Sequence, residues 1–473
     1  MAFGSAPENT SQYVLKKCEF DAVRTFPRGG KVDLKLFVGE ITIFESLLKP
    51  YLTCNIALLD DKGYITDRVQ LQGSETVEIT IGVTREEDAD VEINAKFRVV
   101  KIVNQYKVND KATGYVLHCI SESAFNDSFV KVSKSYHDNL EDIGEKTLKR
   151  YLDVGVVKEK PYWERNEVSD QGPVKVVIPY LSPYHTLEWL MDRATGEGGA
   201  PFFAFTSAWD TKPGKDTVRF GSFKSMVKNG IQKAAPDLTR RKTEQQRTFY
   251  FNQAQVNSTE PGYKKERGLI KHMKQGGIEN TLRMVNMGAV GSRITNLDPF
   301  TSSKISRHHD LVDYLEYLTP EAGMFSTIID KKDKVKIEGV EKTLSEHDAR
   351  AKSLITSYGT YGWNNSYHDT LRPQNLLNKS RKGTIISMLY KNKVECTING
   401  YSFTKERLRV GDIVNIIFDK NDVDGTGMPI TSRDQRRSGF YLILEMSRAY
   451  INNTHEVVVS VCKISDHEPK ASQ

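Results

Sequence analysis

Apolar and polar residues alternate over the last part of the chain in a pattern typical of antiparallel strands. Positions 395–400 switch between the two classes at every residue, and short apolar runs rich in β-branched and aromatic residues follow. The runs span 413–418, 440–444 and 457–464, and the turns fall at 410–412, at Gly439 and at 450–454. Several strands within about seventy residues predict an antiparallel barrel or sandwich.

The same signals predict an all-β unit near the N-terminus. Its strand candidates are 13–23, 31–44, 52–59, 77–83, 91–106 and 114–121. Within 31–44 the alternation changes phase at Gly39, which indicates a bulge or a sharp bend. A turn at 60–63 closes the third candidate, and six strands in about 110 residues predict a first all-β domain.

Helical signals appear between the two β-rich parts. In 138–152 the apolar residues share one helical face, and Asp138 with Glu141 has the spacing of a capping box. A second helix is predicted to start at Ser182-Pro183, a capping residue followed by proline in the first helical position, and to end at Gly196. Short strands are expected at 174–178, 201–205 and 218–223. We interpret this region as a small α+β domain.

The stretch after it is harder to interpret. Residues 236–247 are polar with mixed charge, as expected of a linker, and 263–274 is basic, either a solvated face or a contact for an acidic partner. Strands are predicted at 248–251 and 282–294 and a helix at 375–390.

Composition narrows the class of protein. The chain has 473 residues, 38% of them hydrophobic, and a net charge of +6, which does not require a nucleic-acid partner. No apolar run reaches the roughly 18–20 residues that span a bilayer, and the N-terminus lacks the basic and apolar segments of a secretory signal. The five cysteines contain no CxxC pair and are predicted to be buried free thiols in a reducing compartment.

Motifs for chemistry are absent from the sequence. There is no phosphate-binding glycine loop and no GxSxG elbow. His308-His309-Asp310 lacks the spacing of a metal site, since adjacent side chains on an extended chain point to opposite sides. The acidic stretch 419–427 fails the register of a calcium loop and is predicted to be a hairpin loop. We expect no catalytic residue, cofactor or metal.

Three stretches, in this order and spacing, resemble a known family. They are ITIFESLLKPYLTCNIALLDDKGYI with LQGSETVEITI, then VIPYLSPYHTLEWLMDRA with PFFAF and VRFGSF, then INGYSFTKERLRVGDIVNI with SGFYLILEMSRAYINN and VVVSVCKI. Together they resemble the central baseplate hub proteins of contractile-tailed bacteriophages of the T-even type, and the homologous hub portion of type VI secretion spike proteins. The positions that carry the resemblance are Glu45, Ser46, Pro50, Gly73, Pro179, Ser182, Pro183, Gly400, Gly411, Asp412, Gly439 and Tyr441.

The resemblance implies a mainly β fold (α+β overall), with two tube-like antiparallel β-barrel domains plus small α+β accessory and insertion domains. The implied division is a flexible arm at 1–11, a first tube domain at 12–125, an accessory domain at 126–240, a second, split tube domain at 245–300 and 384–466, an insertion at 301–383 and a tail at 467–473. The family's spike portion has no counterpart here, which implies a stand-alone hub with its spike on another chain.

The function that the resemblance implies is structural. A homotrimer would present six barrels as a pseudo-sixfold ring that joins the hexameric tail tube to the trimeric cell-puncturing spike, and DNA would pass through its lumen without specific binding. Wedge and tape-measure proteins are further candidate partners, and the site of action would be the baseplate of the virion tail after assembly in the host cytoplasm. The polar faces of the long strands are expected to line the lumen.

Two other classes of function stay open from sequence. One is a β-rich receptor-binding or carbohydrate-binding tail protein, for which Tyr358, Tyr361, Trp363 and Tyr367 are the candidate aromatic contacts. The other is an enzyme such as a peptidoglycan hydrolase, which would need paired acids or a metal in a cleft.

Overall fold

The fold was analysed in a computed structural model of the chain. It describes residues 13–21, 30–83, 92–108, 112–158, 173–210, 215–234, 247–251, 268–275, 281–286, 291–299, 302–309, 314, 334–343, 346–347, 350–355, 373–391, 393–423, 429–434, 437–451 and 454–465.

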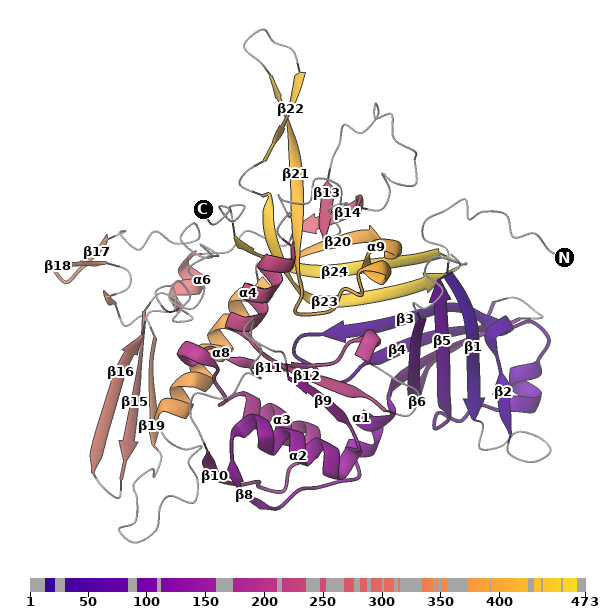
Figure 1. Ribbon diagram of the computed structural model, residues 1–473, viewed down its shortest axis with the longest axis horizontal. Helices are drawn as coiled ribbons and strands as arrows, with labels where there is room; N and C mark the ends of the chain where they lie inside the picture. Colours follow the sequence, from indigo (N-terminus) through magenta and orange to yellow (C-terminus); the bar gives the residue numbers. More distant parts are fainter. Residues whose placement is uncertain are drawn as a thin grey trace.

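The N-terminal part is an antiparallel set of strands, drawn in indigo and purple in Figure 1. Its elements are β1 (Tyr13–Asp21), β2 (Lys31–Asp33), the short helix η1 (Lys35–Phe37), β3 (Val38–Ser46), β4 (Thr53–Asp60), the helical turn η2 (Ile65–Val69), β5 (Thr76–Val83), β6 (Glu92–Lys107) and β7 (Thr113–Ser121). All the strands predicted from the alternation are present, and the pairing of β3 with β4 shifts register between Val38 and Glu40. The predicted bulge at Gly39 is therefore confirmed.

The middle part packs helices against short strands. Its elements are α1 (Glu122–Asp127), β8 (Ser135–Asp138), α2 (Leu140–Leu152), β9 (Gly155–Lys158), β10 (Val174–Val177), α3 (Pro183–Met191), η4 (Glu197–Gly199), β11 (Phe202–Phe205), η5 (Ala208–Asp210), β12 (Thr217–Ser222) and α4 (Phe223–Ala234). Strands β9, β11 and β12 form one small sheet, and β8 pairs with β10.

The C-terminal part begins with β13 (Thr248–Phe251) and β14 (Ile270–Gln275). Its other elements are α6 (Thr281–Asn286), β15 (Ser292–Asp298), β16 (Ser303–His309), β17 (Lys334–Ile337), β18 (Val340–Thr343), β19 (Arg350–Ile355), α8 (Pro373–Lys391), β20 (Lys393–Asn399), α9 (Gly400–Lys405), β21 (Ile413–Val423), β22 (Pro429–Arg433), β23 (Gly439–Ile451) and β24 (Thr454–Ser465). The β21–β22 hairpin extends away from the body of the molecule (Figure 1). The acidic stretch 419–427, predicted to be a hairpin loop, is strand as far as Val423, because residues 419–423 of β21 pair with β22, and residues 424–427 lie outside the described residues.

The N-terminal and C-terminal strands belong to one 14-stranded sheet. Its main path runs β14-β20-β24-β23-β3-β4-β7-β6-β5-β1-β2, with β13, β21 and β22 on a branch. The two sets meet where β3 pairs with β23 in antiparallel register, from Ser46 opposite Glu445 to Glu40 opposite Ile451. The chain is thus mainly β, with large antiparallel sheets, as predicted.

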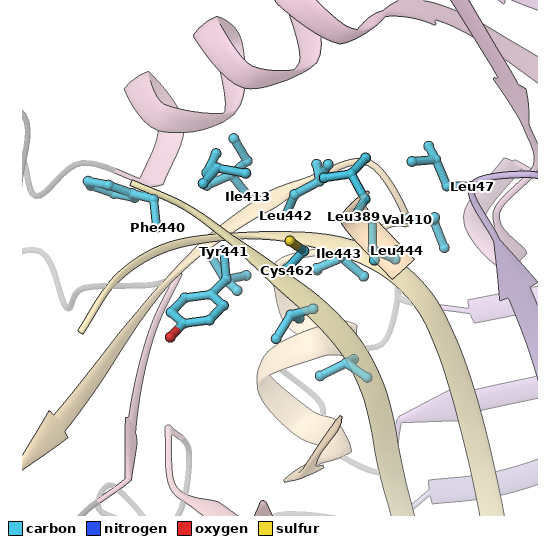
Figure 2. Packing of buried hydrophobic residues seen from close by; sticks show 14 of the residues in the cluster. Leu47, Leu389, Val410, Ile413, Phe440, Tyr441, Leu442, Ile443, Leu444 and Cys462 are labelled. Atoms are coloured by element: carbon cyan, nitrogen blue, oxygen red, sulfur yellow. The ribbon is translucent and has the colours of Figure 1, made fainter. Parts of the chain in front are cut away.

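Three hydrophobic clusters form the core. One fills the N-terminal strands, one lies among the middle helices, and the largest links α4 and α8 to the C-terminal strands. Figure 2 shows part of the largest cluster, where Leu389 of α8 and Leu47 lie close to Leu442 and Leu444 of β23. All five cysteines are buried free thiols, as predicted.

Several predicted boundaries were wrong for local reasons. The candidate strand at 31–44 is interrupted by η1, because the Phe37 N–H bonds to the Leu34 carbonyl in a tight turn. Helix α2 begins at Leu140 behind Asn139 rather than Asp138, because Asp138 belongs to the extended β8.

Two further predictions need correction. Helix α3 ends at Met191, before Gly196, because the N–H groups of Arg193 and Ala194 turn back to the Leu190 carbonyl. Of the strand predicted at 282–294, residues 282–286 belong to helix α6, in which Val285 packs on the core and Leu282 stays exposed, whereas 292–294 belong to strand β15 as predicted. The helix predicted at 375–390 is confirmed as α8. Among the described helices, none is long and apolar enough to cross a membrane.

Candidate functional site: a buried polar junction

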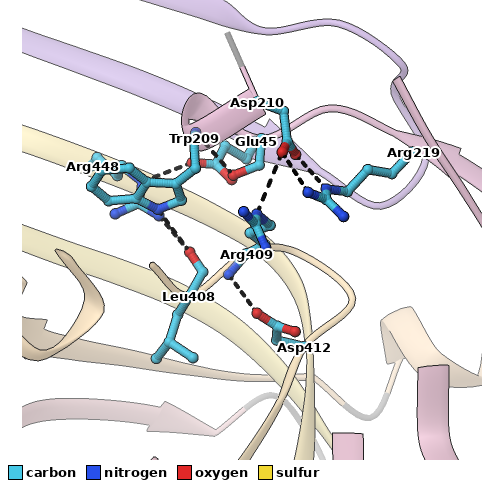
Figure 3. Close-up of polar contacts among 9 residues, drawn as sticks. Glu45, Trp209, Asp210, Arg219, Leu408, Arg409, Asp412 and Arg448 are labelled. Carbon is cyan, nitrogen blue, oxygen red and sulfur yellow. Dashed lines mark hydrogen bonds and ion pairs between the residues drawn. The ribbon is translucent and has the colours of Figure 1, made fainter. Parts of the chain in front are cut away.

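Glu45 lies where all three parts of the fold meet. It points inward from β3, toward β23, η5 and the loop that precedes β21 (Figure 3). Ile41, Ile43 and Glu45 occupy alternate, buried positions of one strand face, so the strand period places a carboxylate in the core. A buried charge requires a partner, because removing an unpaired charge from water into the core costs a large amount of free energy.

The partner of Glu45 is Arg448 of β23. Arg448 Nε donates to Glu45 Oε1 at 2.7 Å, and both side chains have an exposed fraction of 0%. Arg448 also donates from Nη2 to the carbonyl oxygen of Leu408 at 2.7 Å. One guanidinium thus connects β3, β23 and the loop before β21.

Trp209 completes this contact from the middle domain. Its Nε1–H donates to the same Leu408 carbonyl at 3.2 Å, and its ring lies 5.1 Å from the Arg448 guanidinium carbon. An indole ring over a desolvated guanidinium is a favourable cation–π arrangement. The η5 turn, which follows β11, is therefore held against both strand sets.

A second group of charges continues from the first. Arg219 of β12 donates to both oxygens of Asp210, at 2.6 and 2.7 Å, and Arg409 lies 3.6 Å from the same carboxylate. The Arg409 backbone N–H donates to Asp412 Oδ2 at 3.0 Å, and Arg247 Nη1 lies 3.5 Å from Asp412 Oδ1. Asp412, one of the positions of the family resemblance, thereby closes the turn before β21.

Gly400 and His455 lie on the other side of Arg448. His455 is buried and stacks on Tyr450, with ring centroids 4.3 Å apart, and Thr404 Oγ1 lies 3.3 Å from His455 Nδ1. Gly400 starts α9 instead of continuing the predicted alternation, because the Asn399 side chain accepts the Tyr401 N–H and ends β20. Tyr450, predicted in a polar turn, is a buried residue of β23.

The His455 environment predicts a pH dependence of stability. Burial, reinforced by the Arg448 charge, holds the pKa of His455 well below its usual value. Below about pH 6.5 the unfolded chain takes up a proton that the folded chain does not, so this contribution to stability is lost as the pH falls, at up to about 1.4 kcal/mol per pH unit. Replacing His455 with phenylalanine should make the decline in urea-unfolding free energy from pH 7 to 5 shallower. Identical declines for both proteins would contradict the assignment.

The first of the three segments that carry the family resemblance contributes further contacts near Glu45. Ser46 Oγ lies 3.4 Å from the Tyr390 hydroxyl of α8, and the Pro50 carbonyl accepts a hydrogen bond from Thr206 Oγ1 at 2.8 Å. Gly73 has a φ of +91° in the turn before β5, which favours glycine. Only Glu45 of this segment is part of the ion-pair network.

The second segment starts helix α3. Ser182 is its N-cap and accepts the His185 N–H at 3.5 Å, with Pro183 in the first turn, as predicted, while Pro179 is exposed before it. The third segment contributes Gly411, Gly439 and Tyr441. Gly411 has a φ of +83°, and an added Cβ would lie 3.0 Å from Phe205. Gly439 begins β23, and Tyr441 is buried and donates a hydrogen bond to the Arg437 carbonyl.

The Ser182 cap has a measurable consequence. Ser182→Ala is expected to lower the free energy of unfolding by about 1 kcal/mol, because a first-turn N–H and the 2.8 Å contact with His185 Nδ1 lose their partner. Urea denaturation of the full chain measures this. The exposed Ser135→Ala in β8 is the control and should change little; equal effects would show that the cap is not the cause.

Sequence reasoning missed the residues that surround Glu45. Arg448 and Glu45 each replace an apolar residue at an inward position of an otherwise apolar strand, and that signal was readable in both strands. Trp209 and Asp210 carried no such signal, since they lie in a short turn. Arg219 carried none either, since it occupies the partly accessible position between the buried Val218 and Phe220 of β12.

The Glu45 and Arg448 side chains are paired and buried, whereas Arg409 and Asp412 of the second group are partly exposed. Burial raises the pKa of the Cys119 and Cys396 thiols elsewhere in the core to about 12, which disfavours the nucleophilic thiolate. Within the described ranges, no three His, Cys, Asp or Glu side chains are placed to hold a metal. Asp310 and the aromatic candidates at 358–367 lie outside the described residues.

Comparisons with known proteins concern the whole chain. It matches no protein-family model and no curated protein. Among solved structures, it is similar to the tail protein from Neisseria meningitidis MC58 at a TM-score of 0.48 and 10% identity, covering 97% of this chain and 99% of that one. It is also similar to the 43 kDa tail protein of prophage MuSo2 from Shewanella oneidensis, at a TM-score of 0.49 and 10% identity, covering 95% and 99%.

A third similar structure is a component of the type VI secretion system of E. coli that exhibits structural similarity to T4 bacteriophage tail proteins gp27 and gp5. The TM-score is 0.38 and the identity 7%, with 92% of this chain and 76% of that chain covered. These structural neighbours are thus two tail proteins, one of them from a prophage, and a type VI secretion component.

Proposed function

We propose that this chain is a structural baseplate hub of a contractile phage tail, without enzymatic activity, located in the virion tail. Three copies form a ring that joins the hexameric tail tube to the trimeric spike and leaves a channel for DNA. Its two tube domains are the strand sets within 12–125 and within 245–300 and 384–466; the segments 126–240 and 301–383 are accessory and insertion domains.

The continuous sheet is the observation that carries this proposal. Because β3 pairs with β23, one chain holds two antiparallel strand sets side by side in a fixed relation. Three such chains would present six strand sets, and a threefold protein meets a sixfold one when each subunit offers two comparable surfaces. The buried Glu45–Arg448 pair at the seam supports a rigid spacing between them.

The polar faces of the N-terminal strands are suited to line the channel. In β5 from Thr76 to Ile81, and in β6 from Glu92 to Val99, the apolar residues are buried while the residues between them are partly accessible, so this face is not covered by another part of the described chain. Beyond Val99, the apolar Val100, Val103 and Tyr106 of β6 are exposed as well. Lys17 lies 2.7 Å from Glu78, and Lys31 lies 2.9 Å from Glu19, which mixes both charges across the strands. A surface of balanced charge would let DNA pass without holding it.

Light scattering after size exclusion, with pull-down, tests the proposal. The purified chain should elute at three times its mass of 53.6 kDa and should retain both the tail tube protein and the spike protein of its own gene cluster. A monomer that retains neither protein would contradict the hub role. Lysis of purified cell walls by the chain would contradict its non-enzymatic character.

A further inference from the structure

A cavity of about 260 Å³ lies between α3, α8, β11 and the turn after β3. It is separate from the Glu45 junction, although Leu47 and Pro50 of the turn after β3 line it. Segments from three distant parts of the sequence, around positions 50, 190–204 and 384, converge on it, so its shape is set by the tertiary fold rather than by one loop.

Seven of the ten residues that line the cavity are apolar. Leu47, Met191 and Phe203 are at most 1% exposed, and Ile386 of α8 is packed against the same core cluster. A space with such walls favours a ligand with an aliphatic body, since contact with these side chains removes apolar surface from water.

Three charged side chains also line the cavity. The Lys382 ammonium, whose side chain is 9% exposed, lies 3.3 Å from Asp192 Oδ1 and 5.3 Å from the centre of the Phe203 ring. Glu188, one turn before Asp192 on α3, has no cation within ion-pair distance among the residues that the structure describes. Burial raises the pKa of Glu188 and lowers that of Lys382. For both groups, the neighbouring charges therefore offset only part of the cost of removing the charged form from water.

The sum of these charges determines whether the cavity favours a cation or an anion. Asp192 and Lys382 neutralise each other, which leaves the Glu188 carboxylate as an excess negative charge at an apolar cavity. A bound cation would bring the sum to zero, whereas a bound anion would bring it to two negative charges in a site with a low dielectric constant.

We propose that this cavity is a docking site for a cation on an aliphatic stem, the side chain of a lysine or arginine of a partner protein. The stem packs on the apolar walls and the charged end reaches Glu188. The site does not depend on the hub function, and it stands if the chain has another role.

Three probes of equal length separate the alternatives on the full chain. n-Hexylammonium chloride should raise the Tm by about 2 °C at tenfold its Kd, as expected for binding to the folded state only. Sodium hexanoate and 1-hexanol should raise it less. An equal Tm shift with hexanol would show that charge plays no part in binding. A larger shift with hexanoate would show that the cavity prefers an anion. No shift with any probe would show that the cavity is not a binding site for such ligands.

Variants locate the effect. Glu188→Gln should abolish the hexylammonium shift, and Lys382→Met should increase it, because the competing positive charge is gone. Glu338→Gln, at an exposed turn between β17 and β18, is the matched control and should keep the shift. A shift that survives Glu188→Gln, or that disappears in Lys382→Met, would contradict the proposal.

Discussion

Replacing Arg448 with alanine is expected to lower the free energy of unfolding by about 3–5 kcal/mol, because it leaves the Glu45 carboxylate buried without its partner. The change also removes a donor to the Leu408 carbonyl and the cation under the Trp209 ring. Urea denaturation followed by tryptophan fluorescence measures the loss, since Trp209 reports on the junction itself.

Two further variants test the cause of that loss. Glu45→Leu combined with Arg448→Met should be less destabilising than Arg448→Ala alone, because no unpaired charge remains in the core. Lys271→Ala, which breaks the exposed 2.6 Å pair with Glu456, should change the free energy by about 0–1 kcal/mol. If Arg448→Ala lowered the free energy of unfolding no more than Lys271→Ala, the buried pair would not stabilise the contact between β3 and β23.

Replacing Gly400 with alanine is expected to lower the free energy of unfolding by about 3 kcal/mol, at the upper end for overpacking. An added Cβ would lie 2.1 Å from Nδ1 of His455. That ring cannot move aside easily, because it is buried and stacked on Tyr450. Thermal and urea unfolding of the full chain would show the loss.

A matched glycine provides the control. Gly383 lies within α8, and an added Cβ there meets no atom within 4 Å. Gly383→Ala should therefore raise stability by about 0.5–1 kcal/mol through its higher helix propensity. Equal losses in the two variants would show that contact with His455 is not what requires glycine at position 400.

Local signals predicted much of the fold. The phase change at Gly39, the Ser182 cap and the apolar runs of β21, β23 and β24 each depend on a few neighbouring residues, and the structure has each element. Predictions failed where a tertiary contact decided the outcome. Val285, for example, is held on the core by a helical turn that no alternation in 282–294 indicated.

The candidate site was only half visible in the sequence. Glu45 was found through its segment, but its partner Arg448 is 403 residues away, and strand order cannot be derived from strand content. The pairing of β3 with β23 is a long-range result of folding. The one signal in the sequence for this pairing was an inward-facing charge of opposite sign in each of the two otherwise apolar strands.

The polar junction connects three parts of the chain. Glu45, Arg448, Trp209 and the Leu408 carbonyl tie the two strand sets and the middle domain through directional contacts. Apolar packing alone tolerates small slips, whereas a desolvated ion pair is strongly weakened by them. We infer that the pair keeps the two sets in one fixed relation.

Electron microscopy of the purified full chain tests the central claim most directly. We expect a particle with threefold symmetry, a central channel and six lobes around it, with two lobes contributed by each chain. A compact monomer without a channel, unchanged when the tail tube and spike proteins of its gene cluster are added, would contradict the hub assignment.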